Sequence, residues 1–185
     1  FRSQFGSWSF DSKWMAYTKI TETQFQKIFL YDVDKNKSIA LTDGLSDATE
    51  PVFDKGGKYL FFFASTDAGP VINWFDQSNQ DMRSTNSIYL VTLQKETNSP
   101  FAKESDEEKV KEPTDTSKTK KEAVATSEKK SASLVIDWDG IQNRIIDLPI
   151  QAGNYNQLGM GKEGELLYVA NNDNGPGVMH KYDLN

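Results

Sequence analysis

The sequence predicts an all-β fold: an incomplete β-propeller of about 2.75 four-stranded antiparallel blades, interrupted by a disordered charged insertion. Three observations lead to this prediction. Short segments rich in aromatic and aliphatic residues recur along the chain, one segment pattern repeats at an offset of 45 residues, and a long charged stretch interrupts the pattern. Because a repeat of fixed length determines the architecture, the fold prediction depends mainly on this repeat.

The ordered parts of the chain are predicted to be strands throughout. Short runs of Tyr, Phe, Ile, Leu and Val alternate with turns made of Asp, Asn, Gly and Lys, a composition typical of β-structure. Outside the charged stretch, no apolar stripe of helical period and length is present. The predicted strands are WMAYTK, IFLYDV, SIALT, KYLFFFAS, SIYLVTL, SLVIDW, NRIIDLPI, ELLYVAN and MHKYDLN.

A turn followed by an aromatic strand occurs three times. WSFDSKWMAY (8–17) aligns without a gap with FDKGGKYLFF (53–62). In a third copy, KEGELLYVANN, Gly164 takes the place of Ser12 and Gly57, and Leu166 takes that of Trp14. The turn between the first two strands of each unit needs residues that tolerate positive φ, which explains the Gly, Ser and Asp found there.

Each repeat unit is a sheet with two apolar faces, so a single unit would leave apolar surface exposed to water. Radial stacking of such sheets as propeller blades buries both faces. The predicted blades cover residues 3–42, 47–150 and 154–185, and the third lacks its last strand. Because a closed ring typically has about four to eight blades, the chain is expected to be part of a longer ring.

Residues 95–133 form the charged insertion inside the second predicted blade. This stretch contains 9 Lys, 9 Asp or Glu, and one aromatic residue, Phe101. It holds too little apolar surface to offset the entropy of ordering, so it is predicted to be disordered. A solvated insertion is the favoured interpretation, and a recognition tail or regulated tether is the alternative.

The overall composition excludes several classes of function. The net charge of −6 argues against nucleic acid or an anionic membrane as the main partner. The absence of Cys excludes disulfide and thiolate chemistry. No apolar run is long enough to span a membrane, and FRSQFGSWSF has neither the basic start nor the apolar stretch of a signal peptide. The chain begins as if it were part of a longer one.

Several motifs resemble a known family. WSFDSKWMAY looks like the W-S-P-D-G-K-aromatic repeat of the TolB, dipeptidyl-peptidase and tricorn groups, with Phe10 where Pro is usual. The stretches STDAGPVINWFDQSNQDMRSTNSIYLVTL, SPFAKESDEE and LVIDWDGIQNRIIDLPIQAGNY, in this order, resemble bacterial tricorn-type serine peptidases. Together the likeness extends over most of the chain from about Trp8 onward.

The resemblance implies a non-catalytic propeller segment that gates peptides or channels them to a separate catalytic domain, in a parent protein that is a serine-type peptidase. The implied partners are peptide substrates and the other domains of a homo-oligomeric parent, in the periplasm or alternatively the cytoplasm. A TolB-like scaffold for protein–protein interaction, with no peptidase activity, is the second hypothesis. We assign no catalytic residue, cofactor or metal to this chain.

Two motifs resemble catalytic or cofactor sites. GMGKEG (159–164) has the G-x-G-x-x-G spacing of a dinucleotide loop, but a strand follows it where such a loop needs a helix. A hairpin turn is therefore the favoured interpretation. His180 is the chain's one histidine, and we favour a surface or interstrand position over the role of a catalytic base.

The remaining candidates concern binding. Trp74, Phe75 and Asp76 lie in a predicted 21-residue loop and are the candidate peptide contacts, with an aromatic plug over the blade edge as the favoured alternative. Residues 171–175 carry the side-chain oxygens that calcium prefers but lack the carboxylate spacing of a calcium loop, which favours a hairpin turn. The acidic residues of SDATEP and Asp147 are candidates for a charged channel mouth.

Overall fold

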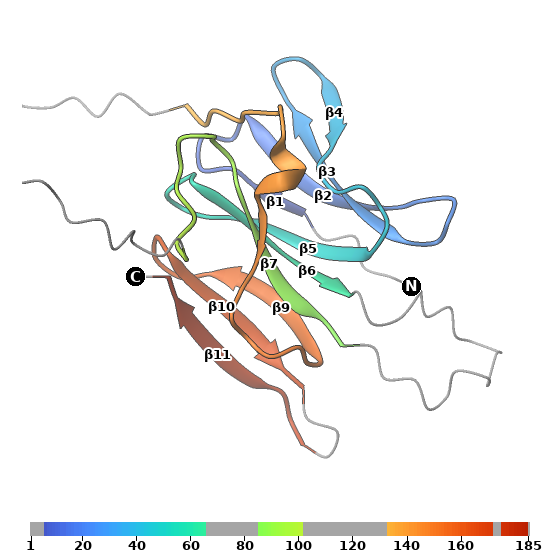
Figure 1. Cartoon of the computed structure of the whole chain (residues 1–185), viewed down its shortest axis with the longest axis vertical. Coiled ribbons are helices and arrows are strands. Elements are labelled where there is room, and N and C mark those ends of the chain that lie inside the picture. The colour runs from blue at the N-terminus through green and yellow to red at the C-terminus, as the bar shows by residue number, and fades with distance from the viewer. Residues whose placement is uncertain (1–5, 66–84, 102–132, 172–174, 185) are drawn as a thin grey trace, which may run out of the picture.

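The computed structural model describes residues 6–65, 85–101, 133–171 and 175–184, and its strands form three antiparallel sheets (Figure 1). The prediction of an all-β fold is confirmed. Each sheet follows the order of the chain from its first strand to its last. Sheet 1 holds β1 (Gly6–Trp8), β2 (Trp14–Ile20), β3 (Gln26–Asp32) and β4 (Lys37–Ala40). Sheet 2 holds β5 (Asp47–Phe53), β6 (Tyr59–Ser65), β7 (Ser87–Thr92) and β8 (Ile145–Asp147), and sheet 3 holds β9 (Tyr155–Met160), β10 (Glu165–Ala170) and β11 (Val178–Asp183).

The three sheets converge at their first strands. β5 lies next to both β1 and β9, whereas β4 and β8 are the opposite edges of their sheets. This arrangement places sheet 2 between the other two (Figure 1). Its strands must therefore bury both of their faces.

Strand β6, with the sequence YLFFFAS, packs on both neighbouring sheets. Leu60, Phe62 and Ala64 join a core with sheet 1, and Phe61 and Phe63 on the other face join a core with sheet 3. These five side chains are at most 4% exposed. A strand buried on both faces needs apolar residues at consecutive positions, which explains the unbroken apolar run.

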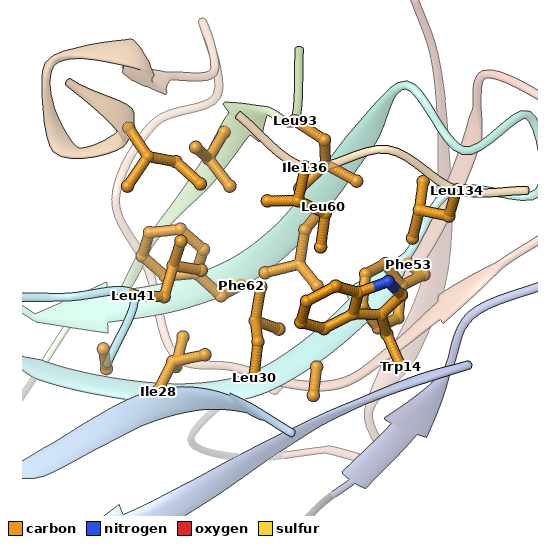
Figure 2. Close-up of a cluster of buried hydrophobic side chains, with 14 of the residues drawn as sticks. Trp14, Ile28, Leu30, Leu41, Phe53, Leu60, Phe62, Leu93, Leu134 and Ile136 are labelled. Carbon is orange, nitrogen blue, oxygen red and sulfur yellow. The ribbon is translucent and has the colours of Figure 1, made fainter. Parts of the chain in front are cut away.

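The core between sheets 1 and 2 is closed by a segment that crosses it (Figure 2). Leu134 and Ile136 pack there beside Trp14 of β2 and Leu93, which follows β7. Residues 133–138 were predicted as a strand, but they pair with no described strand. The segment leads into the 3-10 helix η2 (Ile141–Arg144) and then into β8.

Arg144 holds the crossing segment in place by binding backbone carbonyls. Its Nε donates to the carbonyl of Thr92 at 3.1 Å and its Nη1 to that of Asp139 at 2.9 Å, while Nη2 donates to the carbonyl of Asp137. Lys95 binds the same segment, through its backbone N–H to Asp137 and through its ammonium to Asp139 at 2.6 Å. Lys95, the first residue of the predicted charged insertion, is thus fixed to the crossing segment, and residues 102–132 lie outside the described part of the chain.

The repeat predicted the turns between the first two strands of each sheet. Ser12, Gly57 and Gly164 all have left-handed φ values, of 57°, 69° and 77°. Residues 159–164 accordingly form the end of β9 and a hairpin turn to β10. Within GMGKEG, Gly164 is the glycine that needs positive φ.

The predicted equivalence of Leu166 and Trp14 was wrong by one residue. Trp8 pairs with Met15 and Phe53 with Leu60, with six residues between the partners, but only five separate Met160 from Leu166. Leu166 therefore matches Leu60, and it faces sheet 2 just as Leu60 faces sheet 1. The shorter turn shifts the alternation of faces by one position.

We predict that Gly57→Ala destabilises the fold more than Gly159→Ala. A left-handed φ costs a non-glycine residue about 1–2 kcal/mol. In addition, a Cβ at Gly57 would lie 2.3 Å from Cε1 of Phe10, so the ring must move. A Cβ at Gly159 meets nothing within 4 Å, and its φ is not in the left-handed range, so that variant is expected within about 0.5 kcal/mol of the parent. Urea unfolding of both variants measures the difference, and equal losses would contradict the assigned turn.

Candidate functional site

The interfaces between neighbouring sheets, here called seams, contain hydrogen bonds as well as apolar cores. Between sheets 1 and 2, the hydroxyl of Ser7 on β1 accepts the N–H of Phe53 at 3.2 Å. In the opposite direction, Asp47 of β5 accepts the N–H of Gln26 at 2.7 Å. Each bond joins a side chain of one sheet to the backbone of the next, so it fixes the position of one sheet relative to its neighbour.

Glu50 makes the corresponding link between sheets 2 and 3. Its backbone is left-handed, with φ of 51°, at a register shift in β5. Its side chain crosses to β9, where Oε2 accepts the N–H of Leu158 at 2.8 Å. Gln157 has a similar φ of 55° at a shift in the pairing of β9 with β10. The two irregular strands therefore meet at the Glu50 side chain.

The environment of Glu50 disfavours its ionised form. Glu50 is 8% exposed, and burial raises the pKa of its carboxyl group. Hydrogen bonds from the backbone N–H groups of Leu158 and Gln157 oppose this increase without cancelling it. Desolvation, the larger of the two effects, decides the direction of the shift.

Asp54 links sheets 2 and 3 at the turns. This side chain is 1% exposed, Oδ1 accepts the N–H of Gly164 at 3.1 Å, and Oδ2 accepts that of Gly56 at 3.0 Å. The left-handed Gly164 thus presents its N–H to the neighbouring sheet. The buried Asp54 carboxylate therefore joins the turn before β6 to the turn before β10.

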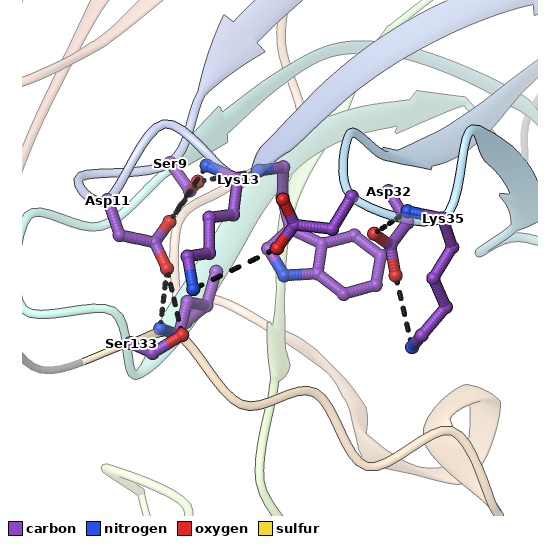
Figure 3. Close-up of polar contacts among 9 residues, drawn as sticks. Ser9, Asp11, Lys13, Asp32, Lys35 and Ser133 are labelled. Atoms are coloured by element: carbon purple, nitrogen blue, oxygen red, sulfur yellow. Dashed lines mark hydrogen bonds and ion pairs between the residues drawn. The ribbon is translucent and has the colours of Figure 1, made fainter.

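Asp11 has the same role between the first turn and the crossing segment (Figure 3). Its Oδ1 accepts the Ser9 hydroxyl at 2.6 Å and the N–H of Lys13 at 3.2 Å, and Oδ2 accepts the N–H of Leu134 at 2.7 Å. Partial burial works to raise the pKa of Asp11, but these hydrogen bonds outweigh it and the pKa is lowered. Asp11 is therefore held as an anion that anchors residue 134.

Asp32, at the end of β3, binds within its own turn (Figure 3). Its Oδ1 accepts the N–H of Lys35 at 3.0 Å, and its Oδ2 lies 3.2 Å from the Lys35 ammonium. The backbone hydrogen bond, with the nearby ammonium, lowers the pKa of Asp32. This carboxylate stabilises a turn and joins no second sheet.

The described residues form a cavity at each seam between the sheets. A cavity of about 260 Å³ lies between sheets 1 and 2, with an apolar floor that includes the stacked rings of Phe62 and Tyr89. Its other described lining residues are Thr42, Asp43, Ser46, Ala64, Gln142 and Ile145. A cavity of about 430 Å³ lies between the turns of sheets 2 and 3 and has a charged lining. The volume of the second cavity lies within the usual range for small-molecule sites, whereas that of the first lies just below this range.

Those residues singled out in the sequence that the structure describes are not brought together. Trp74, Phe75 and Asp76 lie outside the described residues, as does most of 171–175. His180 is exposed on β11, and its ring stacks on Tyr168 with centroids 5.4 Å apart, which is a packing contact.

The acidic residues that were predicted to line a channel mouth also lie apart from one another in the structure. Asp47 and Glu50 of SDATEP bind backbone groups of the neighbouring sheets. Asp147 is exposed on β8, the edge of sheet 2 farthest in strand order from β5. Sequence reasoning did not single out Asp11 and Asp54, which act at the seams.

The described residues do not form a metal site, since no group of three or more His, Asp or Glu among them could hold an ion. No helix in the described ranges is long and apolar enough to cross a membrane. The described residues do leave cavities at the seams between sheets.

A family model described as the tricorn protease second beta propeller domain matches residues 3–185. The chain belongs to this family. The three sheets are therefore propeller blades, and the predicted propeller fold and tricorn-type resemblance are confirmed. No curated protein sequence matches the chain at a significant level.

Solved structures show the same propeller fold. A crystal structure of the tricorn protease is similar over 97% of this chain and 17% of that chain, with 18% identity and a TM-score of 0.61. A putative TolB from Agrobacterium tumefaciens is similar over 98% of this chain and 46% of its own, with 12% identity and a TM-score of 0.54. TolB from Acinetobacter baumannii is similar over 97% of this chain and 29% of its own, at 14% identity and a TM-score of 0.50. The match to this chain thus covers less than half of each of these chains.

We predict that the unfolding free energy of the parent chain, measured relative to that of a Glu50→Gln variant, increases as the pH falls from neutral. Because the pKa is raised in the folded state, protonation stabilises the fold as the pH drops through the folded value. The gain continues toward the ordinary value of 4.5 and levels off below it.

The measurement is the difference in unfolding free energy between parent and variant from about pH 8 to about pH 4. The Gln side chain does not titrate and so supplies the reference. A parent chain that loses stability relative to Glu50→Gln on acidification would show that the folded pKa is lowered.

Proposed function

We propose that this chain is a non-catalytic propeller segment that guides peptides toward a catalytic domain elsewhere in a tricorn-like serine peptidase. The observation that carries the proposal is the family match over residues 3–185. The cavities between the described blades are consistent with a binding role.

The blade seams suit a segment that must keep its shape while peptides move past it. Apolar cores and side-chain-to-backbone hydrogen bonds join each pair of neighbouring sheets. Rigid elements hold a binding surface more precisely than loops do. In this proposal the blades supply the frame, and the segment between β6 and β7, with Trp74 and Phe75, supplies the peptide contact.

A scaffold for protein–protein interaction is the second candidate. The similarity to two TolB structures favours it, since those chains share the propeller fold at low identity. The two proposals differ in what the full-length protein does to peptides. The first also requires that the gene encode a serine-peptidase region besides this propeller.

We expect the double variant Trp74→Ala/Phe75→Ala of the full-length protein to hydrolyse long peptides more slowly. Loss of an aromatic contact that binds peptide typically costs over 1 kcal/mol, so kcat/KM for a peptide of about 20 residues should fall roughly fivefold or more. Hydrolysis of a short chromogenic substrate, which needs no guidance, should be unchanged.

The control is Val135→Ala, which truncates an apolar side chain that is 54% exposed on the crossing segment. It should change neither rate. Equal slowing of long and short substrates would remove the guiding role. A full-length protein that cleaves no peptide but retains one stable protein partner would favour the scaffold instead.

A further inference from the structure

The cavity of about 430 Å³ between sheets 2 and 3 lies where two hairpin turns meet. Lys58 and Tyr59 come from the turn and start of β6, and Glu163 and Gly164 come from the turn before β10. This volume is within the usual range for small-molecule sites, which is roughly 300–1,000 Å³. The cavity is therefore large enough for a small organic group.

The charged groups that line the cavity leave an excess of negative charge. Asp54 is buried and holds two backbone N–H groups, but no ammonium lies within ion-pairing distance of it among the described residues. Glu163 pairs with Lys58 at 3.0 Å. Two carboxylates thus face one ammonium, and a buried carboxylate is costly unless charge or hydrogen bonds offset it.

The Lys58 ammonium shows that a carboxylate at this cavity can bind a cationic amine. The hydrogen bond from Lys58 to Glu163, with the attraction between their charges, raises the pKa of Lys58. The Glu163 side chain reaches across the seam to do this: a Cβ at Gly56 would lie 2.5 Å from its Oε1. Gly56 therefore leaves room for a carboxylate that binds an ammonium at the mouth of the cavity.

Apolar groups form the rest of the described lining. The ring of Tyr59 is partly buried and packs edge-on against Phe61, and Pro100 and Leu184 complete the wall. Such a wall suits the methylene or branched carbons that accompany an amine. An aromatic ring also attracts a cation that lies over its face.

We propose that this cavity binds the ammonium group of a small alkylamine, with Glu163 and Asp54 as the anionic side and Tyr59, Leu184 and Pro100 against the carbon chain. The ammonium can come from the amino terminus of a peptide or from a lysine side chain. Lys58 competes with the ligand for Glu163. The inference rests on this cavity and does not require peptidase activity.

The test is calorimetric titration of the full-length protein at about pH 6.5, where an α-amino group is protonated. Leucine amide represents a peptide amino terminus, and Nα-acetyl-lysine amide represents a lysine side chain. The neutral 4-methylpentanamide has the carbon chain of leucine amide without its ammonium. We expect at least one amine to bind, the neutral amide to bind more weakly, and the tighter amine to identify the source.

Two variants should change the affinity in opposite directions. Glu163→Gln removes the carboxylate and should weaken amine binding roughly two- to fivefold, the range of a partly exposed ion pair. Lys58→Met removes the competitor and should strengthen binding by a similar factor. The matched controls are Glu165→Gln and Lys181→Met, which break an ion pair of 3.1 Å that does not line the cavity.

Three results would overturn the proposal. They are the absence of amine binding to both the parent and Lys58→Met, binding of 4-methylpentanamide as tight as that of leucine amide, and equal effects of the cavity variants and their controls. Loss of peptidase activity in any variant has no bearing on these binding measurements.

Discussion

The double-sided burial of β6 is the constraint on which the rest of the structure depends. Its side chains alternate between a core shared with sheet 1 and a core shared with sheet 3. Exposure of either face of β6 to water would expose large side chains such as Phe61 and Phe62, which are 0% and 2% exposed in the fold. Burial of one such side chain contributes about 1.5–3 kcal/mol, so the two cores, to both of which β6 contributes, hold the three blades together.

The hydrogen bonds between blades fix the relative position of the blades, which apolar packing alone does not do. Apolar contacts tolerate sliding, whereas a side-chain oxygen that accepts a particular N–H fixes one position. Asp11, Glu50 and Asp54 each bind backbone beyond their own strand pair. Part of the chain's acidic excess thus serves to join neighbouring elements. The same seams leave the cavities that give the segment its capacity to bind.

The sequence predicted the propeller fold correctly but did not predict the hydrogen bonds between blades. Ser12, Gly57 and Gly164 were recognised because a left-handed turn restricts residue type at one position of every repeat. The register of Leu166 was missed because a turn shortened by one residue changes the face of each later side chain without changing the composition. The carboxylates of Asp11, Glu50 and Asp54 were missed as links because their partners are backbone groups, which any residue provides and no motif records. A signal existed for Asp11, which directly precedes the left-handed Ser12, and for Asp54, which lies three residues before the left-handed Gly57.

Hydrogen exchange of the 185-residue chain tests the central claim most directly. β2, β6 and β10 all pair with a strand on each side, but of these three strands only β6 is packed between two other sheets. The account predicts that the amides of Tyr59–Ser65 exchange more slowly than those of Trp14–Ile20 and Glu165–Ala170. Exchange of β6 as fast as that of β2 and β10 would contradict it.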